Sequence, residues 1–215
     1  PNSRWYSGAG LYRPVWLHVA PRHHLKMDGI RIRTLSLDPA VVEVSVEATE
    51  VGHLDIDILG VKQSVETDAS GKAVIRFTLP GVQPWSCETP QTYPCTVHYR
   101  SADGTCEDEA TTNFGVRTIA WGADKGLLLN GKRVILRGAC IRHDNGILGA
   151  ACWEDAVERK VRLLQKAGYN AIRSAHNPCS KALLDACDRL GMLVMDEFVD
   201  CWYIHKTVND YVNDF

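Results

Sequence analysis

Side chains that can transfer protons or hold polar ligands collect at three places in the second half of the sequence, each around the end of a short apolar run. They are Arg142, His143 and Asp144, then Arg173, His176 and Asn177, and finally Asp196 and Glu197, with Asp200 and Trp202 close behind. Imidazole and carboxyl groups act as general acids and bases, and guanidinium groups orient carboxylates. If the three runs are parallel strands, their carboxyl ends meet at one edge of a sheet, where α/β proteins bind ligands. The pattern therefore predicts a polar ligand site.

Some of these residues also have a purely structural interpretation. Arg173 lies inside an apolar run, where an unpaired charge is costly, so it requires an acidic partner, and a structural ion pair is one alternative. His176 precedes Asn177 and a proline, so it can simply cap a turn, and Trp202 can belong to a core. These alternatives stay open beside the ligand site.

Asp196 and Glu197 are neighbours on a predicted strand, so their side chains face opposite sides of the sheet. At most one points into the site, and the other is expected to bond to backbone or to a neighbouring strand. A metal site built from His143, Asp144 and Glu197 is an alternative, because imidazole and oxygen ligands suit several divalent ions. Oxygen-rich groups at strand ends are common without metals, and we predict no metal site.

Two helices are expected to position these groups. The first is predicted over 153–167, with acidic residues in its first turn and Gly168 at its end. The second is predicted to begin after the cap Ser180 and to end at Gly191. Apolar residues at i, i+4 and i+7 are Val157, Val161 and Leu164 in the first helix and Leu183, Cys187 and Leu190 in the second.

Buried strands are expected on either side of these helices. NAIRSAH and MLVMDEF are the second and third strands, and the first lies in GLLLNGKRVILRGACI, which also carries a hairpin turn at Asn130-Gly131. The order β-α-β-α-β predicts a parallel sheet with right-handed crossovers.

Residues 21–115 have a different character. Short runs of alternating apolar and polar residues are separated by turn residues, which predicts an antiparallel β-sandwich of about five to seven strands. The runs are IRIRTLSL, VVEVSVEA, LDIDILG, KAVIRFTL and CTVHYRS. The preceding segment 11–20, LYRPVWLHVA, is largely apolar at both alternating sets of positions and predicts a strand buried on both faces.

The composition is that of an ordinary globular protein. The 215 residues are 45% hydrophobic and 23% charged, which excludes a wholly disordered chain. The net charge of −2 does not favour a polyanion such as nucleic acid as partner. No apolar run reaches the length of about 18 residues that a membrane span requires.

Eight cysteines are present without a CxxC pair, so a zinc ribbon is not predicted. Reduced thiols that act as small hydrophobes are favoured, and a Cys87–Cys95 pair is the alternative. Reduced thiols favour a reducing compartment and hence the cytoplasm, with a secreted or periplasmic location as the alternative.

Four stretches carry a resemblance to a known family. NAIRSAHNPCSKALLDACDRLGMLVMDE resembles the signature of glycoside hydrolase family 2, the β-galactosidase and β-glucuronidase group. SRWYSGAGLYRPVWL is similar to the end of that family's N-terminal sugar-binding jelly roll, and PWSCETPQTYPCTV to a loop of its immunoglobulin-like domain, with Cys87 in place of the usual proline. FGVRTIAWGADKGLLLNGKRVILRGACIRHDNGILGA is similar to the beginning of its catalytic TIM barrel. SRWYSG and the motif around His143-Asp144 resemble the bacterial β-galactosidases.

The resemblance implies a multidomain β and α/β architecture. Residues 1–20 would be the C-terminal tail of the jelly roll, 21–115 the immunoglobulin-like β-sandwich, and 116–215 the first three βα units of the TIM barrel. The chain is then interpreted as a central fragment of a longer enzyme.

Several residue roles are implied by the resemblance alone. Arg173 resembles the arginine that orients the nucleophile carboxylate, whose acidic partner would then lie outside this chain. His176 and Asn177 resemble a stretch that contacts sugar hydroxyls, with Ala175 where the family has serine. The remaining implied substrate-binding residues are Arg4, from the jelly-roll tail, His143 and Asp144, after the first strand, and Asp200 and Trp202, near the galactose pocket.

Family members are retaining glycosidases that use two catalytic carboxylates. One is a glutamate in an Asn-Glu motif, and no Asn-Glu dipeptide occurs in the 215 residues. Both catalytic glutamates are therefore expected beyond residue 215, and the chain alone is expected to be inactive.

The predicted parent enzyme hydrolyses terminal β-galactosides. A carbohydrate is the predicted substrate, with no cofactor, no nucleic acid and no membrane as partner, and the remainder of the enzyme or an oligomeric partner is expected to complete it. The alternatives are a β-glucuronidase or β-mannosidase of the same family, or a structural or binding fragment without chemistry.

Overall fold

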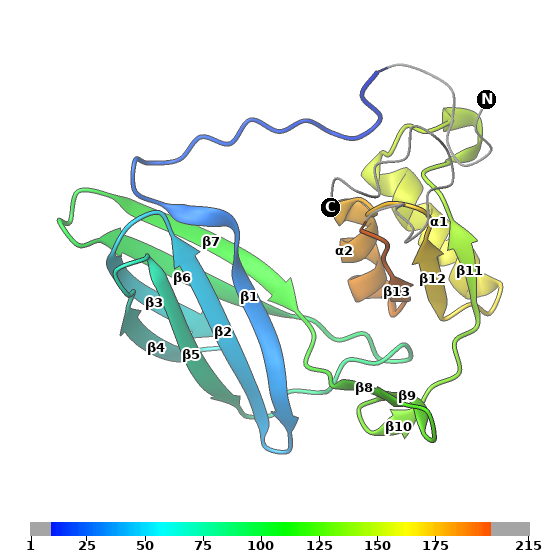
Figure 1. Ribbon diagram of the computed structural model, residues 1–215, viewed down its shortest axis with the longest axis horizontal. Helices are drawn as coiled ribbons and strands as arrows, with labels where there is room; N and C mark the ends of the chain where they lie inside the picture. Colours follow the sequence, from blue (N-terminus) through cyan, green and yellow to red (C-terminus); the bar gives the residue numbers. More distant parts are fainter. Residues whose placement is uncertain (1–9, 199–215) are drawn as a thin grey trace. The chain divides into compact units, whose positions relative to one another are not determined.

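The computed structural model of the chain describes residues 10–198, which form two compact units. Strands alone make up the first unit, residues 16–135, and the second unit, residues 10–15 with 136–198, contains the helices (Figure 1). None of the helices described is long and apolar enough to span a membrane.

Seven strands of the first unit form two antiparallel sheets packed face to face (Figure 1). One sheet has the order β1-β2-β5, from Leu25–Leu37, Ala40–Ala48 and Lys72–Leu79. The other has the order β4-β3-β6-β7, from Val61–Glu66, Gly52–Ile58, Tyr93–Ser101 and Glu107–Phe114. The predicted antiparallel sandwich is confirmed, and no helix occurs in residues 25–110.

The core of the sandwich follows from the alternation in its strands. In β2, Val42, Val44 and Val46 are completely buried, while Glu43 and Glu47 occupy the alternate positions and point outward. The opposite sheet contributes further buried aliphatic and aromatic side chains to the same cluster. Each fully buried aliphatic side chain contributes about 1.5–3 kcal/mol, so this core dominates the stability of the unit.

A three-stranded sheet, β10-β9-β8, follows the sandwich in the same unit; its strands are Lys132–Arg133, Gly126–Leu129 and Ile119–Gly122. Asn130 and Gly131 connect β9 and β10 with positive φ values of 53° and 75°, which is the two-residue hairpin turn predicted for Asn-Gly. The side chain of Asn130 also donates to the carbonyl of Trp85 at 2.9 Å. The predicted hairpin is therefore confirmed.

The second unit contains a parallel sheet in the order β11-β12-β13, from Gly138–Ile141, Ala171–Ser174 and Leu193–Met195. Between the strands run α1, Glu154–Lys166, and α2, Lys181–Leu190, with a short 3₁₀ helix, η1, at Gly146–Leu148. The predicted β-α-β-α-β order is confirmed, and any helix after β13 lies outside the described residues.

Both helices are bounded as their sequences predict. The Ser180 hydroxyl accepts a hydrogen bond from the backbone N–H of Leu183 at 3.2 Å, and Gly191 ends α2 in the left-handed conformation at φ 80°. Val157 and Val161 of α1 are buried in the same cluster as Leu183 of α2. The helices thus bury one stripe each against the sheet.

The strand predicted over 11–20 is wrong. The segment forms no strand with any part of residues 10–198, and most of its apolar side chains are exposed, with Leu17 90% accessible. Alternating apolar residues form a strand only where a neighbouring edge accepts their backbone hydrogen bonds. Only Tyr12 and Arg13 are half-buried, and both contact the second unit to which they belong.

Candidate functional site

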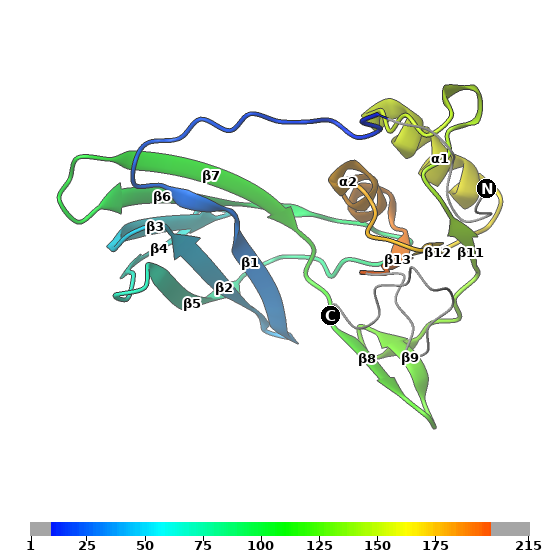
Figure 2. The same cartoon turned by 45° about the horizontal axis from the view of Figure 1, so that its top comes forward.

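The parallel sheet presents two chemically different faces. Cys140, Arg173 and Met195 are aligned across the three strands, so their side chains project from one face. Ile172 and Val194 project from the other face and belong to an apolar cluster with residues of α1 and α2. Both helices lie on one side of the three strands (Figure 2). A charged side chain inside an apolar strand is tolerated here because it points away from that cluster.

Arg173 has a partner within the chain. Its Nη2 forms an ion pair with the carboxylate of Glu197, and its Nη1 donates to Cys140 Sγ at 3.4 Å. Glu197 comes two positions after Met195, the register partner of Arg173, and therefore projects from the same face. The expectation that this chain holds no acidic partner for Arg173 is thus wrong.

Asp196 points the other way, as the strand alternation predicts. Its Oδ1 accepts a hydrogen bond from the backbone N–H of Cys179 at 3.1 Å, at the loop before α2. Retaining glycosidases need two carboxyl groups about 5–5.5 Å apart, flanking one glycosidic bond. With Asp196 on one face and Glu197 ion-paired on the other, these two carboxylates do not form such a pair.

His143 and Asn177 line a cavity of about 30 Å³ beside the helix-covered face of the sheet. Arg13 and Lys160 line it as well, which makes its polar part cationic. A cavity of this volume has room for water molecules and not for a sugar ring.

His143 is held against the N-terminal segment. Its ring stacks on Tyr12 with centroids 4.7 Å apart, and Arg13 Nη2 donates to the carbonyl of Pro178 at 2.6 Å. Burial, followed by the positive charge of Arg13, holds the pKa of His143 below its ordinary value. The neutral imidazole is therefore the favoured form in this position.

Asp144 contacts α1 rather than a second carboxylate. Its Oδ1 lies 3.6 Å from Lys160 Nζ, which also donates to the carbonyl of Arg142 at 2.9 Å. Burial lowers the pKa of Lys160 despite the nearby Asp144. The lysine fixes the loop after β11 to the helix that follows it.

The turn after β12 carries the remaining described candidates. Ser174 Oγ donates to the carbonyl of Asn177 at 3.0 Å, and the buried Nδ1 of His176 has no hydrogen-bond partner within residues 10–198. Arg4, Asp200 and Trp202 lie outside the described residues.

The structure therefore divides the predicted site residues into two groups. Arg173 and Glu197 share the open face of the sheet, whereas His143 and Asn177 line the small cavity on the other side. His143, Asp144 and Glu197 have separate neighbours, and no group of three metal-ligating side chains occurs in the described part of the chain.

Sequence reasoning missed the side chains that hold these groups in place. Cys140, Tyr12, Arg13 and Lys160 each contact a predicted site residue or line the same cavity. Lys160 carried a usable signal, because a lysine on the helix directly after Asp144 is within reach of it. Tyr12 and Arg13 contact residues more than a hundred positions away in the sequence, and no local sequence pattern predicts such contacts.

Lowering the pH through about 6.5 is expected to destabilise the second unit through His143. Because its folded-state pKa is depressed, its contribution is present above the unfolded-state pKa and is lost as the pH falls through the folded-state pKa. NMR titration of the ring protons measures this value directly. His53 is the control, because its hydrogen bond to Glu66 raises its pKa. A His143 pKa at or above that of His53 contradicts the prediction.

Comparison with known proteins decides the family. A model described as glycosyl hydrolases family 2 matches residues 26–117, and the model of that family's TIM barrel domain matches residues 123–211. The chain belongs to glycosyl hydrolase family 2. Its fold is accordingly an immunoglobulin-like domain followed by the start of a TIM barrel, and the open face with Arg173 is on the barrel part.

Individual relatives of this family 2 chain agree on the family and differ in activity. Beta-galactosidase BoGH2A of Bacteroides ovatus is 36% identical over 100% of this chain and 27% of its own length. A Formosa agariphila protein with a provisional beta-glucuronidase name is 35% identical over 98% of this chain and 21% of its own length. A solved family 2 structure from Bacteroides cellulosilyticus matches 99% of this chain and 30% of its own, with 38% identity and a TM-score of 0.82. The chain spans between a fifth and a third of these relatives.

Proposed function

We propose that this chain is a section of a retaining glycosidase that hydrolyses terminal β-galactosides. The observation that carries the proposal is the family membership, together with the relative BoGH2A, a β-galactosidase that is 36% identical along the whole chain. A β-glucuronide is the second candidate substrate, favoured by the Formosa agariphila relative at 35% identity. The proposed organisation is a jelly-roll tail at 1–20, the immunoglobulin-like domain at 21–115 and barrel sequence at 116–215. The proposed location is the cytoplasm.

Within this proposal Arg173 is a positioning residue for a carboxylate. Glu197 and Cys140 hold one side of its guanidinium group, and 41% of its side chain remains exposed on the open face. A guanidinium group has five donors, so it can bind Glu197 and still receive another carboxylate. Because Cys140 and Glu197 already hold the guanidinium group of Arg173, its side chain loses little conformational freedom when that carboxylate binds.

The substrate assignment is tested on a protein that joins this chain to the further sections that its relatives carry. We expect kcat/KM for nitrophenyl β-galactoside to exceed those for the β-glucuronide and the β-mannoside by at least about tenfold, or about 1.4 kcal/mol in transition-state binding. A preference for the glucuronide selects the second candidate, and no turnover on any glycoside refutes the proposal.

The role of Arg173 is tested in the same protein. Removing a preorganised electrostatic contact typically costs about 100-fold in kcat, and Arg173→Gln is expected to show a loss of this size. Arg162→Gln, on the exposed side of α1, is the matched control. An Arg173→Gln variant that equals the control contradicts the positioning role.

A further inference from the structure

The outer face of the β1-β2-β5 sheet carries two carboxylates on its central strand, each flanked by cations from the outer strands. Glu43 is in register with Arg33 of β1 and Arg76 of β5, and it contacts them at 2.8 Å and 3.2 Å. These hydrogen bonds lower the pKa of Glu43. One carboxylate is thus held between two guanidinium groups.

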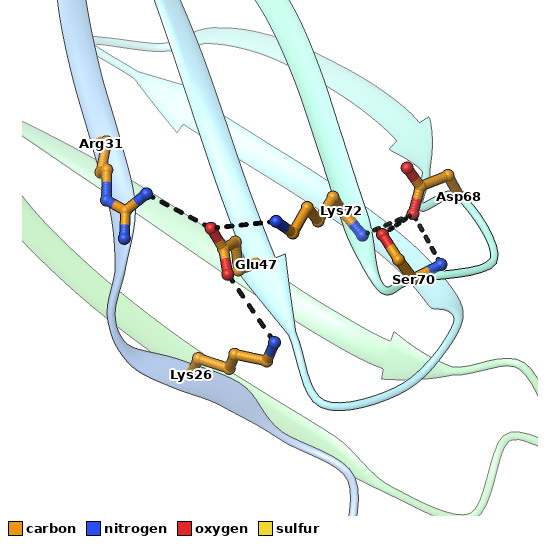
Figure 3. Close-up of polar contacts among 6 residues, drawn as sticks. All are labelled: Lys26, Arg31, Glu47, Asp68, Ser70 and Lys72. Atoms are coloured by element: carbon orange, nitrogen blue, oxygen red, sulfur yellow. Dashed lines mark hydrogen bonds and ion pairs between the residues drawn. The ribbon is translucent and has the colours of Figure 1, made fainter.

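Glu47 has three cationic partners on the same face (Figure 3). Arg31 lies 3.3 Å away, and Lys26 and Lys72 each lie 3.7 Å away, so that the carboxylate sits among nitrogen atoms from both outer strands. We call the five cations of these two groups the basic face; they are Lys26, Arg31, Arg33, Lys72 and Arg76.

The cations of the basic face are exposed to solvent, and the two carboxylates that they surround are less exposed. The side chains of Glu43 and Glu47 are 18% exposed, whereas those of the five cations are 44–72% exposed. Each arginine has five N–H donors in a fork, and most of them are left for an external anion.

The sandwich is also electrically polarised. The three strands of this sheet hold five cations and three carboxylates, with Asp28 as the third, for a net charge of +2. The four strands of the opposite sheet hold six carboxylates and two cations, for a net charge of −4. Within the strands alone, cations are thus concentrated on one sheet and carboxylates on the other, which the whole-chain charge of −2 does not reveal.

We propose that the basic face binds an acidic polysaccharide whose sugar units carry carboxylates. The arginines there already bind a carboxylate, Glu43, so the geometry suits this group. The surface is the outer face of a three-stranded sheet, which offers an extended polymer several contacts along its length. Sites for single-stranded nucleic acid commonly combine cations with aromatic side chains on which the bases stack, and the only aromatic residue of these three strands, Phe77, is fully buried. That the partner is a saccharide rests on the proposed function, whereas its negative charge is inferred from the cations of this face.

The test is binding of polygalacturonate to this chain, measured by fluorescence anisotropy or calorimetry at about 20 mM and about 150 mM salt. We expect binding at low salt that weakens by at least about tenfold at the higher concentration, because exposed charges are screened beyond a Debye length. Neutral galactan is expected not to bind. Dextran sulfate, polyglutamate and single-stranded DNA are competitors, and tighter binding of any of them than of polygalacturonate overturns the choice of partner.

Charge variants locate the site by the sign of their effects. Combining Arg31→Gln, Arg33→Gln and Arg76→Gln is expected to weaken binding by at least about tenfold, whereas Glu43→Gln with Glu47→Gln is expected to strengthen it severalfold. The combination of Lys62→Gln, Arg100→Gln and Arg162→Gln, at exposed positions away from this sheet, removes the same number of charges and is the control for total charge. The corresponding Arg→Lys triple variant separates charge from misfolding, because it keeps the sign and is expected to retain binding.

Equal losses in the basic-face and control variants, or no binding of polygalacturonate at low salt, overturn the proposal. The readout needs no catalysis, so a failure here leaves the proposed hydrolysis untouched. Likewise, a longer protein without glycosidase activity would leave a positive binding result standing.

Discussion

The 215-residue chain by itself is expected to release no nitrophenol from a chromogenic β-galactoside above the rate in buffer. Retaining hydrolysis needs one carboxyl group as acid/base and a second as nucleophile across the same bond. The sequence has no Asn-Glu motif, and Asp196 and Glu197 face opposite sides of the sheet. Enzymes accelerate reactions by at least about 10⁶-fold, so the expected loss relative to a complete family 2 enzyme is of that order.

A sensitive fluorogenic substrate and repeated purification make this measurement decisive. Glu197→Gln and Asp196→Asn are the informative variants, because these two carboxylates directly follow β13 at its carboxyl end. Turnover that survives repurification and disappears in either variant shows that the chain holds catalytic machinery of its own. Turnover unchanged in both variants indicates a contaminating hydrolase.

The elements that the sequence predicts correctly are those whose signals are local. α2 begins after Ser180 and ends at Gly191, because a hydroxyl cap and a left-handed glycine act within one turn. Asn130-Gly131 forms its hairpin turn for the same reason. The alternation in β2 likewise determines which residues are buried. Segment 11–20 shows the limit of such signals, because a strand also requires an edge to pair with.

Long-range contacts account for what the sequence leaves open at the site. The apolar run around Arg173 predicts that it needs an acidic partner. That this partner is Glu197 depends on the register between β12 and β13, which no local sequence pattern gives. Similarly, His143 and Arg173 are separated because they lie on opposite sides of one sheet. The prediction that their strands end at the same edge of the sheet does not give this separation. Side-chain direction therefore decides site membership as much as strand order does.

Amide hydrogens in the central strands β2, β3 and β6 are expected to exchange at least about 10³ times more slowly than those in β11, β12 and β13, a difference of about 4 kcal/mol in opening free energy. Two sheets bury each other's inner faces in the sandwich. The parallel sheet is covered by helices on one face only within the described residues, and Met195 on its other face is 57% exposed. Parallel sheets are ordinarily covered on both faces, so this one is expected to open readily.

Paired substitutions show whether the two units open independently. Phe77→Ala removes a completely buried ring and is expected to cost the sandwich about 3–5 kcal/mol, which speeds exchange in β2 while leaving β12 unchanged. Val74→Ala, at a 60% exposed position of the same strand, is the control and is expected to change exchange little. The exchange is followed by NMR on a sample shown to be monomeric by sedimentation. If the amides of β12 in that monomer are as protected as those of β2, the parallel sheet is stable without cover on its open face and does not open readily.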